Sequence, residues 1–164
     1  MRQPVGLGFM TIRGVNIRNT FGKGIRTDAR TALPRNHDGW DIACMSGSPV
    51  YAILDGSVEF TNDSYGGYGK SVVLKVSYRS STYYILYAHL MRIDVKKGQA
   101  VKEAERLGLS GQTGNAAGQA PVEAHLHFEV PTTPGGGAID PGKILGYQPV
   151  VETIMSDFRA GLGS

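Results

Sequence analysis

The chain has very little cysteine and no long apolar run. Cys44 is the only cysteine among 164 residues, so an intrachain disulfide is excluded and the redox compartment stays open. Cysteine-based zinc-finger spacing is absent. No stretch is long enough to cross a membrane as a helix, and residues 1–10 lack the continuous apolar core of a signal peptide.

Basic and acidic residues are also nearly balanced in number. Seventeen Lys and Arg face fourteen Asp and Glu, for a net charge of +3 and a pI near 9.0. This mild basicity suits contact with an anionic polymer but is too small to indicate nucleic-acid binding. No basic stretch interleaved with aromatic residues supports such binding either.

Glycine, in contrast, is abundant, with 23 residues. A chain of this length and composition predicts one domain that is mainly β, with many turns. The predicted strands are 42–44, 50–53, 57–61, 70–78, 82–90, 106–110 and 125–130, and residues 95–101 are predicted to form a turn and a short strand. Strands 50–53 and 57–61 are predicted to form a hairpin about Asp55-Gly56, and 70–78 with 82–90 a central one. Residues 1–15 are expected to be an extended lead-in, and 16–35 a loop with short strands. Apolar spacing over 150–158 predicts a short C-terminal helix packed on the body, the alternative being a helix that meets a partner.

The most informative stretch is Glu123–Val130. Leu126, Phe128 and Val130 alternate with His125, His127 and Glu129, which predicts a half-buried strand with both imidazoles on one face. Such a pair suits a metal site, or one ligand beside a proton-transfer group. Two ordinary surface or core histidines are the plain alternative.

The other two histidines lie in equally suggestive places. His37 and Asp41 stand four residues apart around Gly39, a spacing with which a loop can wrap a zinc ion. His89 ends the apolar run that begins at Tyr83. Taken singly, a polar turn and a strand-end histidine explain them as well. Cys44 is predicted to face away from Asp41 and to be a small buried residue rather than a ligand.

These motifs together resemble those of the lysostaphin-type (LytM-like) zinc endopeptidases, which cut peptide bonds in bacterial cell walls. The resemblance rests on His37-x-Gly39-x-Asp41, Tyr87-Ala88-His89-Leu90 and His125-Leu126-His127-Phe128-Glu129. Further similar segments occur in the same order: Phe21-Gly22, residues 47–52, residues 55–58, Gly67-Tyr68-Gly69, residues 98–101, residues 111–114 and Asp140-Pro141. The similarity covers about residues 16–146, and the order of three separate motifs makes it specific.

The resemblance implies an antiparallel β-sheet core with an open groove and long loops. It assigns one zinc ion (Zn2+) to the ligands His37, Asp41 and His127, with water at the open position. It assigns catalytic roles to His89 and His125, which would remove a proton from the attacking water and stabilise the oxyanion. Glu129 is expected to support a ligand or lie at the surface.

Two departures from the family pattern stand out. Gly24 occupies the position where the family usually has an arginine, and Arg26 is the nearest candidate to replace it. Residues 119–124 lengthen the connection between the Thr113-Gly114 loop and the His-x-His strand. This insertion is expected to enlarge a loop beside the groove. The loop 65–69 is an equally plausible groove wall or an ordinary hairpin loop.

The leading hypothesis is a monomeric zinc metalloendopeptidase that hydrolyses a stem peptide or cross-link of peptidoglycan at the cell wall. The alternatives are a non-catalytic relative that binds the wall or activates another hydrolase, and a module with a structural zinc. Without a visible signal peptide, we expect either a trimmed chain or delivery by another route, as for a phage lysin or a secreted antibacterial effector. For such an effector, an immunity or inhibitor protein or a delivery machinery is the expected partner.

Overall fold

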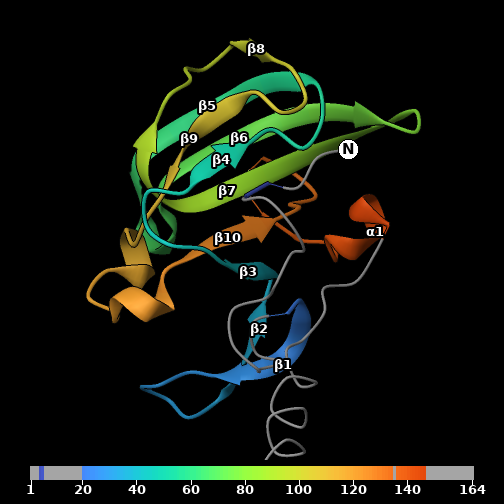
Figure 1. The fold of residues 1–164 in the computed structure, drawn as a ribbon. Helices are drawn as coiled ribbons and strands as arrows, with labels where there is room; N and C mark the ends of the chain where they lie inside the picture. Colours follow the sequence, from blue (N-terminus) through green and yellow to red (C-terminus); the bar gives the residue numbers. More distant parts are fainter. Residues whose placement is uncertain (1–3, 6–19, 135, 147–164) are drawn as a thin grey trace, which may run out of the picture.

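The computed structural model describes residues 4–5, 20–134 and 136–146, and in this part of the chain the fold is almost entirely β (Figure 1). The strands are β1 (Gly22–Thr27), β2 (Pro34–His37), β3 (Gly39–Ala43), β4 (Pro49–Tyr51), β5 (Gly56–Tyr65), β6 (Gly69–Tyr78), β7 (Ser81–Ile93), β8 (Ala100–Val101), β9 (Arg106–Ser110) and β10 (His125–Glu129). Short 3-10 turns cover Gly66–Tyr68, Gly114–Ala116 and Pro121–Glu123, and one short helix, α1, covers Gly142–Leu145.

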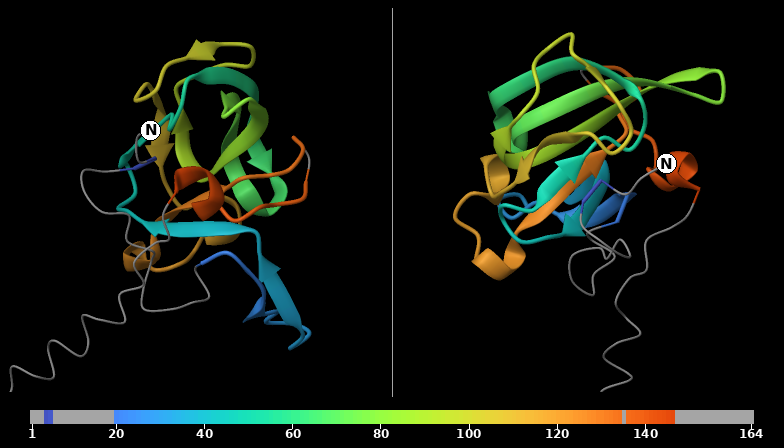
Figure 2. Two further views of the ribbon diagram at one scale, coloured as in Figure 1. Left: turned by 90° about the vertical axis from the view of Figure 1, so that its right-hand side faces the viewer. Right: turned by 45° about the horizontal axis from the view of Figure 1, so that its top comes forward.

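Eight strands form one antiparallel sheet. Six of them follow the order β3-β10-β7-β6-β5-β8. The other two are β9, which pairs with β7, and β4, which pairs with β9. Strands β1 and β2 form a separate two-stranded sheet. This blue hairpin lies below β3 in Figure 1, and Figure 2 (left) shows it projecting from the body. The mainly antiparallel fold expected from the sequence is therefore confirmed.

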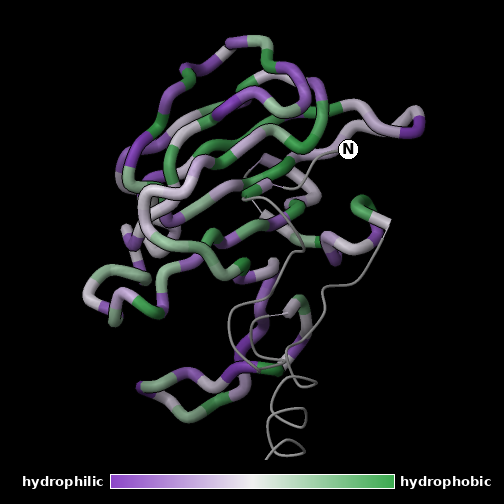
Figure 3. The backbone as a smooth tube through the Cα atoms, viewed as in Figure 1, coloured by the Kyte–Doolittle hydropathy of each residue, from purple (hydrophilic) through white to green (hydrophobic). Residues whose placement is uncertain are grey.

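The main core lies on one face of the central strands. Alternate residues such as Leu74 on β6, Tyr87 on β7 and Phe128 on β10 are fully buried there. A smaller cluster of Val73, Leu86 and Ala88 occupies the opposite face. Figure 3 shows hydrophobic residues along these inner strands and hydrophilic residues at the tip of the β6–β7 hairpin. Because both faces of β10 are covered, it is buried along its whole length and not half-buried as predicted.

The predicted central hairpin is confirmed as β6 and β7, which pair from Lys70↔Leu90 to Tyr78↔Ser81. The predicted hairpin of 50–53 with 57–61 is wrong, because β4 pairs with β9 whereas β5 pairs with β6 and β8. The Asp55 carboxylate accepts hydrogen bonds from the Glu103 backbone N–H and the Lys102 ammonium, at 2.8 and 2.9 Å. These contacts hold the turn against the chain at 102–103.

The predicted helix over 150–158 and most of the predicted lead-in lie outside the described residues. Val5 is described and forms a single bridge with Val50 on β4. Among the described residues, no helix is long and apolar enough to cross a membrane.

Candidate metal centre and groove

The site is assembled where β10 runs beside β3. In this ladder His127 stands opposite Asp41, and Glu129 stands opposite Gly39. Because Leu126 and Phe128 fill the main core, the alternate residues His125, His127 and Glu129 project from the other face of the sheet. A Cβ at Gly39 would lie 2.4 Å from the Phe128 carbonyl oxygen and 3.1 Å from His127 Cε1. Glycine therefore allows β3 to approach β10 closely at this point.

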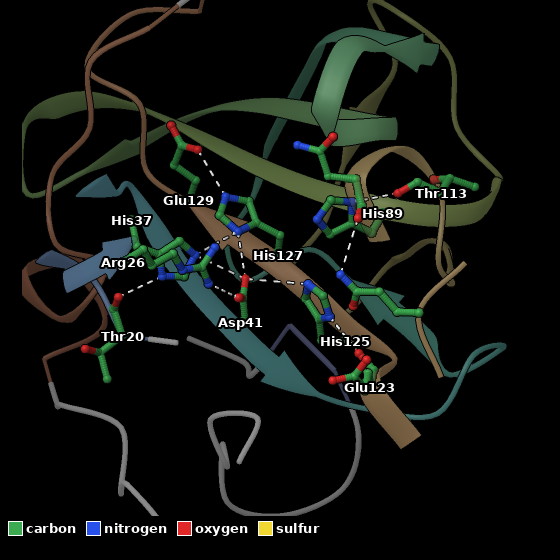
Figure 4. Close-up of polar contacts among 12 residues, drawn as sticks. Thr20, Arg26, His37, Asp41, His89, Thr113, Glu123, His125, His127 and Glu129 are labelled. Carbon is green, nitrogen blue, oxygen red and sulfur yellow. Dashed lines mark hydrogen bonds and ion pairs between the residues drawn. The ribbon is translucent and has the colours of Figure 1, made fainter. Parts of the chain in front are cut away.

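Three side chains converge on one point and could hold a metal ion. These are His37, Asp41 and His127, whose ligand atoms all lie within 4.8 Å of one another. Asp41 Oδ1 is 3.2 Å from His37 Nε2 and 2.9 Å from His127 Nδ1, and the two nitrogens are 3.2 Å apart (Figure 4). All three residues are buried. His37 ends β2 and Asp41 lies in the middle of β3, so the predicted ligand loop over 37–41 is instead the junction of two strands.

The remaining polar atoms of these three side chains face partners outside the cluster. His37 Nδ1 donates to the Thr20 carbonyl oxygen at 2.7 Å, and His127 Nε2 donates to Glu129 Oε2 at 3.2 Å. The Arg26 guanidinium donates to Asp41 Oδ2. Outer partners of this kind orient a histidine or carboxylate toward a metal. The lone pairs of two imidazoles and one carboxylate oxygen are thus directed at a single position, which fits a divalent cation.

The pKa values of Asp41 and His127 agree with a site for a cation. Burial opposes ionisation of Asp41, but hydrogen bonds with His127 and His37 outweigh it and hold the pKa of the carboxyl well below its usual range. Burial likewise opposes charge on His127, yet hydrogen bonds with Asp41 and Glu129 raise its pKa to about 9. The pocket therefore accommodates positive charge, which a bound metal would supply in place of a proton.

His89 reaches the same face through a β-bulge. Tyr87 pairs with Val72 and Leu90 with Lys70, so Ala88 and His89 together face one residue of β6. His89 has a φ of 60°, which side-chain-bearing residues rarely adopt. Tyr87 and Leu90 both stay in the core, whereas regular alternation would direct His89 into it. The bulge thus turns the imidazole toward the site.

His89 and His125 lie outside the metal-capable cluster of His37, Asp41 and His127, and each is held by a backbone carbonyl. His89 Nδ1 donates to the Thr113 oxygen at 2.8 Å, and His125 Nδ1 donates to the Glu123 oxygen at 2.9 Å. A carbonyl can only accept, so each ring carries its proton on Nδ1 and presents Nε2 as its basic atom. His125 Nε2 lies 3.7 Å from Asp41 Oδ1. The ring centroids of His89 and His125 are 5.0 Å apart. Burial and the neighbouring imidazoles of His127 and His125 lower the pKa of His89 to about 4, so it is neutral at neutral pH.

Glu129 is buried and supports the site. Besides the contact with His127, its Oε2 accepts a hydrogen bond of 2.8 Å from the Tyr68 hydroxyl. Its burial excludes the surface alternative, and its contact is with His127, one of the three residues that could hold a metal ion. Cys44 is packed against the main core on the side of Ile42, away from Asp41, as predicted, although it is only half-buried.

A cavity of about 1080 Å³ opens over the cluster. Gly67 and Tyr68 line it, which favours the groove-wall interpretation of the loop 65–69 over an ordinary hairpin loop. Gln119, the first residue of the insertion, lines it beside Asn115. The opposite wall, which sequence reasoning missed, is the β1–β2 hairpin, with lining residues Arg26, Thr27, Asp28, Ala29, Arg30, Arg35 and Asn36. The only signal in the sequence was that this polar segment leads directly into His37.

Comparison with known proteins decides the family. Residues 35–141 match the profile of Peptidase family M23. The chain belongs to peptidase family M23. The match includes all four histidines and both motifs that contribute to the metal-capable cluster.

Individual relatives agree with this assignment. The chain is 43% identical over 95 residues to the peptidoglycan DD-endopeptidase ShyA of Vibrio cholerae, covering 57% of this chain and 20% of ShyA. It matches a zinc-containing peptidase structure from Vibrio cholerae with a TM-score of 0.61 and 34% identity, covering 77% of this chain and 35% of that one. The catalytic domain of the antimicrobial peptidase lysostaphin from Staphylococcus simulans matches with a TM-score of 0.61 and 27% identity, over 78% and 90% of the two chains. The chain thus spans about a fifth of the length of ShyA.

Proposed function

We propose that this M23 domain is a zinc endopeptidase that hydrolyses peptide bonds of bacterial peptidoglycan. His37, Asp41 and His127 would hold one zinc ion, and His89 and His125 would carry out proton transfer. The observation that carries the proposal is the convergence of His37 Nε2, Asp41 Oδ1 and His127 Nδ1 within 4.8 Å beside two further imidazoles. Two nitrogens and one oxygen are a ligand set typical of a catalytic zinc, which keeps an open position.

When bound, zinc supplies Lewis-acid chemistry, which polarises a carbonyl and makes water a stronger acid. The chain supplies the proton transfers. Nε2 of His89, which is neutral at neutral pH, or Nε2 of His125 can take the proton of the attacking water and return it to the leaving amine. Once protonated, the same nitrogen donates a hydrogen bond to negative charge that develops on the scissile carbonyl oxygen. The carbonyls of Thr113 and Glu123 hold both rings in the tautomer that this requires.

The groove supports an extended substrate. It runs between the β1–β2 hairpin and the wall formed by Tyr68, Asn115 and Gln119, with the histidines at its floor. A peptide lying along it would place one bond over the cluster. The name of the peptidoglycan DD-endopeptidase ShyA supports peptidoglycan peptides as the substrate class, and hence the cell wall as the place of action.

The test is mass spectrometry of fragments released from purified sacculi of a diaminopimelate-type wall, by zinc-loaded protein and by a chelated control. Zinc-dependent conversion of cross-linked dimers to monomers is the expected result and identifies the bond. A glycine-bridged wall is the second substrate. Absence of zinc-dependent cleavage in both walls, with sacculus binding retained, would contradict the proposal and favour a wall-binding or hydrolase-activating role.

A further inference from the structure

The second oxygen of the Asp41 carboxylate is held by a residue from a different sheet. Arg26 lies on β1, and its guanidinium donates to Asp41 Oδ2, while Oδ1 faces His37 and His127 (Figure 4). The Asp41 side chain is 4% exposed and that of Arg26 23% exposed, so this ion pair is largely shielded from water. The two oxygens of one carboxylate are thus divided between the metal-capable cluster and the arginine.

Arg26 reaches Asp41 because β1 is irregular. The β1–β2 pairing shifts register between Gly22 and Arg26, and Gly24 in this stretch has a φ of 64°, which favours glycine. The Asn36 side chain fixes the bulge by accepting a hydrogen bond of 3.0 Å from the Gly24 backbone N–H. Gly24 therefore shapes the strand, and Arg26 is the residue of this hairpin whose guanidinium contacts Asp41.

We propose that Arg26 is a positioning residue for the metal ligand Asp41. By engaging Oδ2 it fixes the rotation of the carboxylate, so that Oδ1 alone is presented between His37 and His127. Its guanidinium is a planar donor whose fixed geometry suits a carboxylate oxygen, so this contact restrains the orientation of the carboxylate. The assignment rests on the proposed function for the identity of the metal as zinc, but the contact itself does not depend on it.

Two effects of Arg26 on a cation oppose each other. Its positive charge repels the metal, whereas its hydrogen bond orients the ligand and keeps a buried oxygen paired. Because it contacts the oxygen that faces away from the cluster, the orienting effect should dominate. Loss of an outer partner of a metal ligand typically weakens metal binding by about 10–100-fold.

The experiment measures zinc affinity by competition with a chromophoric chelator for the wild type, Arg26→Ala and Arg26→Lys. Lys23→Ala is the matched control, because it removes a cation from the same strand at an exposed residue outside the groove lining. We expect Arg26→Ala to weaken zinc binding about 10–100-fold, Arg26→Lys to recover part of the loss, and Lys23→Ala to stay within about twofold. If Arg26→Ala does not fold, the lysine variant, which keeps the stem and the charge, carries the test.

Separate measurement of kcat and KM distinguishes a positioning role of Arg26 from a role in substrate binding. At saturating zinc, a positioning role predicts that Arg26→Ala lowers kcat with little change in KM. In an Asp41→Asn background, Arg26→Ala should weaken zinc binding no further. Wild-type zinc affinity in folded Arg26→Ala, or a raised KM alone, would overturn the role of Arg26 and leave the proposed function intact. A wild type that binds no zinc would overturn both.

Discussion

His127 and Asp41 face each other across the β10–β3 ladder, and His127 Nδ1 lies 2.9 Å from Asp41 Oδ1. Strand register alone therefore brings together two of the three proposed ligands, although they are 86 residues apart in the sequence. A slip of one residue would send His127 into the core and Phe128 into the groove. The burial of Leu126 and Phe128 thus fixes the strand register on which both the core and the candidate metal site depend.

The two histidines of β10 should have separable roles. His127→Ala removes a proposed ligand, so we expect loss of both zinc and hydrolysis. His125→Ala leaves all three proposed ligands, so it should keep most of the zinc but lose at least about 100-fold in activity, the usual scale for a proton-transfer group. Zinc content by atomic spectroscopy and cleavage of a wall peptide check this. Hydrolysis retained by both variants would rule out the assignment.

Glu129→Gln should weaken zinc binding by about tenfold, because it replaces the charged partner of His127 Nε2 with a neutral one. The chelator competition used for Arg26 measures the change. Glu59→Gln on β5, outside the groove lining, is the control. Equal affinities of the two variants would show that Glu129 does not tune the ligand.

Gly39→Ala should destabilise the β10–β3 contact. The added Cβ would lie 2.4 Å from the Phe128 carbonyl oxygen, so backbone must move. We expect a loss of about 1–3 kcal/mol in the free energy of unfolding, the usual range for overpacking. Chemical denaturation measures it, with Gly136→Ala as the control because a Cβ there meets nothing within 4 Å. An unchanged unfolding midpoint for Gly39→Ala would contradict this packing.

Tyr87→Phe tests a buried polar contact in the core. The Tyr87 hydroxyl accepts a hydrogen bond of 3.2 Å from the Ile53 backbone N–H, and both residues are fully buried. Removing the acceptor should cost about 1–3 kcal/mol, because the N–H remains desolvated. Chemical denaturation measures the change in the free energy of unfolding. A stability equal to that of the wild type would show that the Ile53 N–H has another acceptor.

Cys44 should be a slow thiol. Burial raises the pKa of its thiol, against opposing hydrogen bonds with Ser110 and the Leu126 backbone. Because the thiolate is the reactive form, we expect the folded protein at pH 8 to react with a disulfide reagent at least about tenfold more slowly than the unfolded chain. Equal rates in the two states would contradict the packing of Cys44 against the core.

Much of this architecture follows from alternation in the sequence. The strands β6 and β10 carry apolar residues at every second position over much of their length, and the shared face of His125 and His127 follows from the same rule. The bulge at His89 could not be predicted, because Ala88-His89-Leu90 has no feature that shows where alternation breaks. The pairing of β4 with β9 depends on contacts between distant segments, whereas a local Asp-Gly turn favoured a hairpin. Arg26 was a candidate for the family's arginine, but its contact with Asp41 depends on the bulge at Gly24, which the sequence does not show.

The most direct test of the central claim is a crystal structure of the zinc-loaded protein, with anomalous diffraction recorded on both sides of the zinc edge. The account predicts one zinc peak about 2.0–2.2 Å from His37 Nε2, Asp41 Oδ1 and His127 Nδ1, with no bond to His89 or His125. A zinc held by four protein ligands, or found at another place in the chain, would contradict it.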